Sequence, residues 1–233
     1  MAAALAALVA VSASAQSRDV DLEAADGVTL KATYTSPGRP GPGMLLVHQC
    51  NMDRTSWNDI AAELVGAGVH VLTLDLRGFG ESGGEGIGAG FPAFLETSTA
   101  DVDMAFDYLA SQSGVDASRI GAGGASCGAM LTADLAARRD VEALMLLSGP
   151  PSEAAVANMA GDADLAVFAA AATDDPVTVG VADALQGAVD GSPHASSTAK
   201  IYPGPEHGLP MFEKNADLEP ALLAWLKGEL VGN

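Results

Sequence analysis

The chain has 233 residues, of which 48% are hydrophobic and 18% charged, which argues against disorder and fits one sizeable folded domain. Thirty acidic residues against eleven basic ones give a net charge of −19. A surface of that sign repels phosphate backbones and anionic lipid headgroups, so neither nucleic acid nor a membrane surface is expected as a partner.

The first fifteen residues carry no charged side chain, and their apolar run ends in Ser12-Ala13-Ser14-Ala15. The run is shorter than the roughly 20 residues that span a bilayer, and small residues at 13 and 15 suit a signal peptidase. No basic residue precedes Arg18, and an Ala-rich first helix is the alternative. We predict a signal peptide over residues 1–15 with cleavage after Ala15, a secreted or periplasmic location, a single domain over 16–233 and no membrane insertion after processing.

From residue 20 onward, short apolar runs alternate with longer amphipathic ones, which predicts strands alternating with helices. The expected strands lie at residues 20–23, 28–34, 44–47, 69–74, 120–124, 141–147, 165–171 and around 201–202. The expected helices lie at residues 56–65, 97–111, 127–137 and 216–230. The first two strands flank Ala-Asp-Gly, a hairpin signal. The pattern predicts an α/β fold: a doubly wound, mainly parallel eight-stranded sheet with an antiparallel start and helices on both faces.

Gly124-Ala125-Ser126-Cys127-Gly128 stands where a predicted strand passes into a helix. In a G-x-S-x-G turn the serine takes a strained backbone conformation that exposes its hydroxyl, and its neighbours two residues away must be small. We therefore predict Ser126 as a nucleophile, the alternative being a Gly-rich turn with a capping serine. A Cys127 thiolate would be more reactive, but a motif centred there has alanine at both glycine positions.

The acid and base that serve such a serine follow it in the sequence, on loops after later strands. Asp174-Asp175-Pro176 ends the strand at 165–171. We predict Asp175 as the acid, because the proline after it restricts the turn, with Asp174 as the alternative. His207 lies in the loop after the last strand and is predicted as the general base. The other histidines precede the serine or the last strand: His48, His70 and His194.

An oxyanion hole needs two backbone N–H donors, one from the residue after the nucleophile and one from the loop after an early strand. These donors are predicted at Cys127 and at Cys50, with Gln49 as the alternative to Cys50. They are the two cysteines of the chain, and a disulfide and two buried thiols both stay open. No cofactor or metal is expected, since the cysteines and histidines lack zinc-site spacing.

Five segments together resemble the α/β-hydrolase superfamily, and within it the dienelactone hydrolase-like branch. They are His-Gln-Cys-Asn at 48–51, Asp-Leu-Arg-Gly-Phe-Gly-Glu-Ser at 75–82, the turn at 124–128, Asp-Asp-Pro at 174–176 and Pro-Gly-Pro-Glu-His-Gly at 203–208. The resemblance extends from about residue 28 to 230. It implies the α/β-hydrolase fold and a serine hydrolase that cleaves carboxylic esters of small or medium substrates through an acyl-enzyme. Asp75, Arg77 and Gly78 are expected to be scaffold residues.

The sequence departs from that branch in three ways. Members that hydrolyse dienelactones use a cysteine where this chain has Ser126, which argues against that substrate. Gln49 follows His48 in place of the usual glycine, so the oxyanion hole is expected to be shaped differently. About seventeen residues, 148–164, stand where many lipases insert a lid, which predicts little or no lid. The alternative functions are a peptidase or thioesterase on the same triad, or an inactive binding protein of the same fold.

Overall fold

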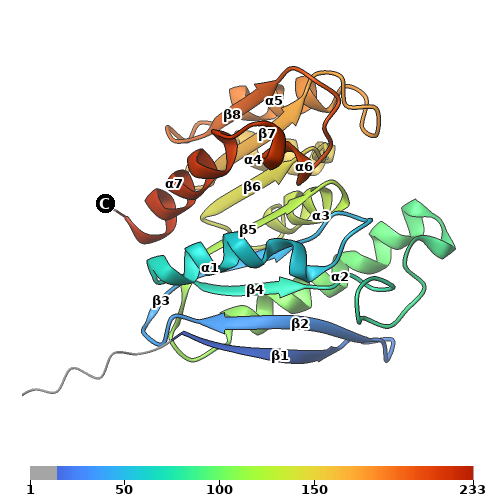
Figure 1. Ribbon diagram of the computed structural model, residues 1–233, viewed down its shortest axis with the longest axis vertical. Coiled ribbons are helices and arrows are strands. Elements are labelled where there is room, and N and C mark those ends of the chain that lie inside the picture. The colour runs from blue at the N-terminus through green and yellow to red at the C-terminus, as the bar shows by residue number, and fades with distance from the viewer. Residues whose placement is uncertain (1–14, 233) are drawn as a thin grey trace, which may run out of the picture.

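The protein is described by a computed structural model over residues 15–232, in which one sheet has the strand order β1-β2-β4-β3-β5-β6-β7-β8 (Figure 1). Its strands are β1 (Gln16–Glu23), β2 (Thr29–Ser36), β3 (Gly41–Val47), β4 (His70–Leu74), β5 (Val115–Ala125), β6 (Ala143–Leu147), β7 (Ala166–Ala172) and β8 (Thr198–Tyr202). Strand β2 runs antiparallel to β1 and β4, and every pairing from β4 to β8 is parallel. The expected mainly parallel sheet with an antiparallel start is confirmed.

Helices cover both faces of the sheet (Figure 1). One face is covered by α1 (Asn58–Ala67) and α7 (Leu218–Val231), which contact each other. The other face is covered by α2 (Phe91–Ala110), α3 (Cys127–Ala136), α4 (Glu153–Gly161) and α5 (Val181–Gly191). Short helical segments are η1 (Arg54–Trp57), η2 (Gly86–Ala89) and α6 (Pro210–Lys214).

A hydrophobic core lies on each face of the sheet, and the central strands contribute side chains to both. In β3, Leu45 and Val47 belong to the core under α2 to α5, whereas Met44 and Leu46 belong to the core under α1 and α7. All four side chains are fully buried. Because successive residues of a strand point to opposite faces, a strand covered on both sides shows a continuous apolar run. This is why the interior strands were predictable from short apolar runs.

The helices differ more from the prediction. Helix α2 begins at Phe91, after Gly90 with φ 97° and with Pro92 in its first turn, and not at residue 97. Helices α4 and α5, which are rich in alanine and polar residues, were not predicted. Helix α4 lies within the stretch 148–164, where little or no lid is expected. Within residues 15–232 no helix combines the length and the hydrophobicity needed to span a membrane. The predicted signal peptide lies outside the described residues, apart from Ala15, and β1 starts at Gln16.

Two buried ion pairs fix the loop after β4. The Asp75 carboxylate bonds the Arg54 guanidinium and accepts the backbone N–H of Arg54 at 2.6 Å. Arg77 makes a two-pronged contact with Asp101 of α2, at 2.6 and 2.7 Å. Both carboxylates are buried, so each charge is compensated within the protein. Asp75 and Arg77 are therefore scaffold residues, as expected.

Candidate active site

Ser126 lies between β5 and α3, at the carboxyl end of the parallel strands. Its backbone has φ 54° and ψ −122°, a conformation that non-glycine residues rarely adopt. A Cβ atom on Gly124 would collide with the backbone of Gly128, and one on Gly128 would collide with the carbonyl oxygen of Val47. Both glycines of the motif are thus required by close backbone approach, and the half-buried serine stands at the tip of a rigid turn.

Asp175 and His207 come together at the same edge of the sheet, from the loops after β7 and β8. The Nδ1–H of His207 donates to Oδ2 of Asp175 at 2.6 Å. The other ring nitrogen, Nε2, is buried and has no hydrogen-bond partner within residues 15–232. Asp174, the alternative acid, is exposed and accepts a bond from Thr173 instead. The structure therefore places Asp175, and not Asp174, against the histidine.

The Asp175 carboxylate is held by more than His207. Its Oδ1 accepts the backbone N–H groups of Val177 at 2.8 Å and Thr178 at 3.2 Å, and its Oδ2 also accepts the Thr178 hydroxyl at 3.0 Å. Burial raises the pKa of Asp175, but the bonds from His207, Val177 and Thr178 outweigh it and lower that pKa below its usual range. The side chain is ionised at neutral pH and keeps a proton on Nδ1 of His207.

Cys50 and Cys127 are joined by a disulfide, with their Cα atoms 5.9 Å apart. Of the two alternatives left open by the sequence, the structure has the bridge and not two free thiols. Cys127 is the first residue of α3, and Cys50 lies in the turn after β3. Their backbone N–H groups, the predicted oxyanion donors, donate no hydrogen bond to another residue of the described chain. The bridge thus links two residues whose backbone N–H groups make no hydrogen bond within residues 15–232.

His48 fixes the orientation of the peptide group between Gln49 and Cys50. The N–H of Leu76 donates to Nε2 of His48 at 3.0 Å, so the proton of this neutral imidazole is on Nδ1. That Nδ1–H donates to the Gln49 carbonyl at 2.8 Å, which also accepts the Met52 N–H at 2.9 Å. Because the C=O and N–H of a trans peptide point in opposite directions, the Cys50 N–H is turned away from His48.

Gln49 connects this turn to the loop of His207. Its buried Oε1 accepts the backbone N–H of Leu209 at 3.0 Å, and its Nε2 donates to Asn51 at 2.7 Å. A Cβ atom on Gly208 would collide with the Gln49 side chain and would lie 3.6 Å from the Cβ of Ala125. The histidine loop is thereby packed against the residue before Ser126. Gln49, which stands where related sequences have a glycine after the histidine, thus forms a hydrogen bond between the turn after β3 and the loop of His207.

Residues 39–169, more than half of the chain, match the sequence model of a hydrolase family described as serine aminopeptidase, S33. The chain belongs to this family. The segment that matches the S33 family includes Ser126, Cys50 and Cys127, and ends before Asp175 and His207.

Two curated proteins of Mycobacterium tuberculosis, the uncharacterized proteins Rv2307c and MT2364, are each 35% identical to this S33 family member over 133 residues. The alignment covers 56% of this chain and 45% of theirs. The chain therefore spans less than half the length of the curated relatives that it matches.

Solved structures share the fold over almost the whole chain. The Pyrococcus furiosus esterase Pf2001 has a TM-score of 0.71 at 16% identity, covering 92% of this chain and 93% of that one. The dienelactone hydrolase-like promiscuous phosphotriesterase P91, from metagenomic libraries, has a TM-score of 0.71 at 16% identity, covering 93% and 99%. At such identities these similarities establish the α/β-hydrolase fold, and they confirm the resemblance noted in the sequence.

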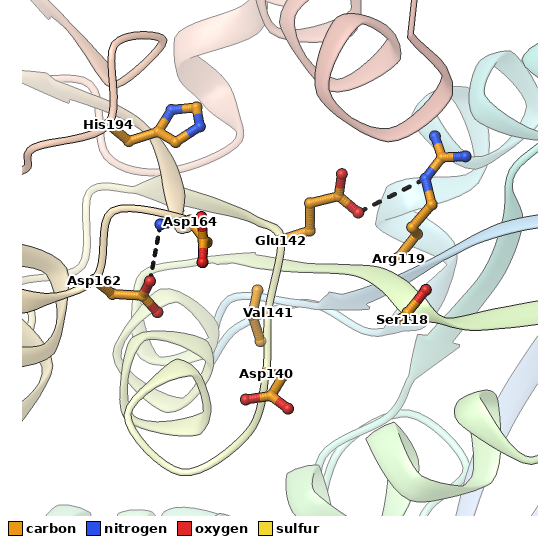
Figure 2. Close-up of a pocket in the computed structure, with 8 residues that line it drawn as sticks. All are labelled: Ser118, Arg119, Asp140, Val141, Glu142, Asp162, Asp164 and His194. Atoms are coloured by element: carbon orange, nitrogen blue, oxygen red, sulfur yellow. Dashed lines mark hydrogen bonds and ion pairs between the residues drawn. The ribbon is translucent and has the colours of Figure 1, made fainter.

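Figure 2 shows a hollow of about 480 Å³ in this S33 family member. It lies toward the amino ends of the parallel strands, whereas Ser126 follows the carboxyl end of β5. It is lined by residues that precede or begin β5 to β8: Ser118, Arg119, Asp140, Val141, Glu142, Asp162, Asp164 and His194. Ser118 donates to Asp116, and the His194 Nδ1 accepts the Ser196 N–H. The serine and the histidine there are bound to other groups, so the hollow does not duplicate the arrangement at Ser126.

Thr178 and Ser148 contribute to the site but were missed from the sequence. Thr178 bonds both Asp175 and the carbonyl oxygen of Ser148, a buried residue with φ 52° at the end of β6. Beside Thr178, Val177 and Val179 expose 65% and 89% of their surface. A Thr three residues after the acid was the available signal, since such spacing suits a turn closed by the acid's side chain.

Proposed function

We propose that the protein is a serine hydrolase that cleaves carboxylic esters of small or medium-sized substrates through an acyl-enzyme at Ser126. The observation that carries the proposal is the hydrogen bond of His207 to the buried Asp175. The Nε2 atom of His207 is buried without a partner in residues 15–232, and the pair lies at the edge of the sheet where the strained serine stands. Membership of a hydrolase family supports the same chemistry.

In this mechanism Nε2 of His207 takes the proton of the Ser126 hydroxyl as Oγ attacks the ester carbonyl. Asp175 holds the Nδ1–H and stabilises the imidazolium that forms. The N–H groups of Cys127 and Cys50 bind the oxyanion, aided by the positive end of the α3 dipole. The imidazolium then protonates the leaving alcohol, and water activated by the neutral His207 releases the acid from the acyl-enzyme.

Ester cleavage is the first choice because Pf2001, which shares the fold, is an esterase, and because an alkoxide leaves more readily than an amide nitrogen. Cleavage of an amino-terminal peptide bond is the second candidate, favoured by the description of the matching family. The same residues serve both reactions, since His207 would protonate either leaving group. The substrate class is therefore a matter for measurement with both kinds of substrate.

We also propose that the protein acts outside the cytoplasm. Support comes from the Cys50–Cys127 disulfide, because such bonds persist mainly in oxidising compartments. The small residues before Gln16 and the start of β1 at Gln16 agree with removal of residues 1–15. Amino-terminal sequencing of the protein exported by an expressing bacterium tests this proposal, and Gln16 is expected as its first residue.

The experiment that tests the function is labelling of the folded protein with a fluorophosphonate, followed by mapping of the modified residue. We expect one tag on Ser126, lost in Ser126→Ala and His207→Ala and kept in Ser118→Ala, a control in the hollow of Figure 2. A panel of p-nitrophenyl esters and aminoacyl anilides then ranks the two substrate classes. A folded protein that takes no tag would overturn the proposal.

A further inference from the structure

We propose that Cys50–Cys127 is a thiol–disulfide exchange site through which a low-molecular-weight thiol lowers the hydrolytic rate. This inference rests on the proposed function. The bridge joins the turn after β3 to the first residue of α3, across 77 residues of sequence. It connects the two residues that supply the oxyanion N–H groups, so its state is expected to affect the transition state more than substrate binding.

The two cysteines differ in exposure. Cys50 is half-buried, whereas Cys127 is 1% exposed. An incoming thiolate therefore attacks Sγ of Cys50, forming a mixed disulfide while the electron pair of the broken S–S bond leaves on Sγ of Cys127. A second thiol attacks the mixed disulfide and releases Cys50. The net reaction consumes two thiols and yields one disulfide of the reagent and two cysteine thiols.

The position of the leaving sulfur favours this direction of attack. Cys127 is the first residue of the ten-residue helix α3, where free N–H groups and the helix dipole stabilise a thiolate. A more stable thiolate is also a faster leaving group in exchange. One of these helix N–H groups, that of Cys127, is also assigned to the oxyanion. A negative sulfur at this helix end therefore competes with the charge that develops in the transition state.

Reduction also loosens the second donor. The Cys50 peptide is still oriented by the bonds of the Gln49 carbonyl to His48 and Met52, so the turn does not unfold. It loses the covalent link that fixes its distance from α3. An oxyanion hole acts by being preorganised, so a donor held less firmly contributes less to kcat.

The test compares kcat, KM and the fluorophosphonate labelling rate of the oxidised protein with those after incubation with dithiothreitol. Removal of one oxyanion donor costs about 10²–10³ in kcat, so we expect a fall of about 10-fold or more on reduction, with KM little changed. Titration should find two thiols per chain, and reoxidation should restore the rate. Circular dichroism at a temperature well below the melting point checks that the reduced protein is folded.

The double variant Cys50→Ser/Cys127→Ser is the matched control, because these are the two cysteines of the chain. It is expected to have a reduced kcat from the start and no response to dithiothreitol. A folded, reduced protein with two titrated thiols and an unchanged kcat would overturn the inference, as would a native bridge that dithiothreitol leaves intact. Failure of the oxidised protein to react with the fluorophosphonate would instead overturn the proposed function.

Discussion

The side-chain oxygen of Gln49 accepts a hydrogen bond from the backbone N–H of Leu209, across 160 residues of sequence. Gln49 precedes Cys50, one proposed oxyanion donor, and Leu209 lies two residues after His207. The bond joins the loop that carries His207, the proposed base, to the turn that carries Cys50, a proposed oxyanion donor. Both partners are buried, so the bond is shielded from competing water.

Gln49→Ala is expected to lower kcat by about 10- to 100-fold, because small displacements of reacting groups cost rates of that order. It should also lower the free energy of unfolding by about 1–3 kcal/mol, since the Leu209 N–H is left buried without a partner. Asn51→Ala is the control, because it removes the partner of Nε2 and keeps the bond to Leu209. Equal kcat values for the two variants would contradict the positioning role of Gln49.

Asp175→Asn is expected to lower kcat by about 10³–10⁴-fold, the size of effect that follows when a triad histidine is left in the wrong tautomer. Asp174→Asn should stay close to wild type, since that carboxylate is exposed and does not contact His207. Steady-state kinetics on the best ester of the panel checks both. A larger loss for Asp174→Asn would exchange the two assignments.

The strand pattern, the position of Ser126 and an acid at 174 or 175 beside His207 could all be predicted from the sequence. Apolar runs and chain order can be read directly from the sequence. The turn around Ser126 is also recognisable there, because close backbone contacts require glycine at positions 124 and 128. The choice between Asp174 and Asp175 was not settled until the fold placed one carboxylate against the ring. The hydrogen bond between the Leu209 N–H and Gln49 links loops that are distant in the sequence, so no local sequence pattern predicts it.

Asp101→Ala is expected to lower the free energy of unfolding by about 3–5 kcal/mol, because Arg77 would be left as a buried charge that has lost its main partner. Asp107→Ala, on the same helix, breaks an exposed pair with Arg139 and should cost about 0–1 kcal/mol. Urea denaturation of the three proteins at one pH measures the difference. Similar losses of unfolding free energy in both variants would show that the buried Arg77–Asp101 pair stabilises the protein no more than the exposed pair.

Acid should destabilise the protein through His48. Burial lowers the pKa of His48 in the folded state, so the unfolded chain binds a proton at a pH where the folded protein does not. The stability contribution is present above the unfolded pKa of about 6.5 and is lost as the pH falls from there to the lower folded value. Each unit of difference between the two pKa values corresponds to about 1.4 kcal/mol.

His48→Asn isolates this contribution. The urea stability of the wild type is expected to fall more steeply between pH 7.5 and 5 than that of the variant. Burial also lowers the pKa of His70, but that residue is present in both proteins and cancels in the comparison. Parallel pH profiles would rule out His48 as the acid-sensitive group.

The loop after β7 alternates between fixed and unconstrained positions. Asp175 and Thr178 are tied to each other and to neighbouring loops, whereas Val177 and Val179 are largely exposed. The exposed side chains at 177 and 179 can therefore be replaced with little loss of stability, directly beside the proposed acid, except by a proline at 177, which would remove the N–H that bonds Asp175. These two positions are where natural drift or a laboratory library would introduce sequence variation first, while the turn around Ser126 stays the same.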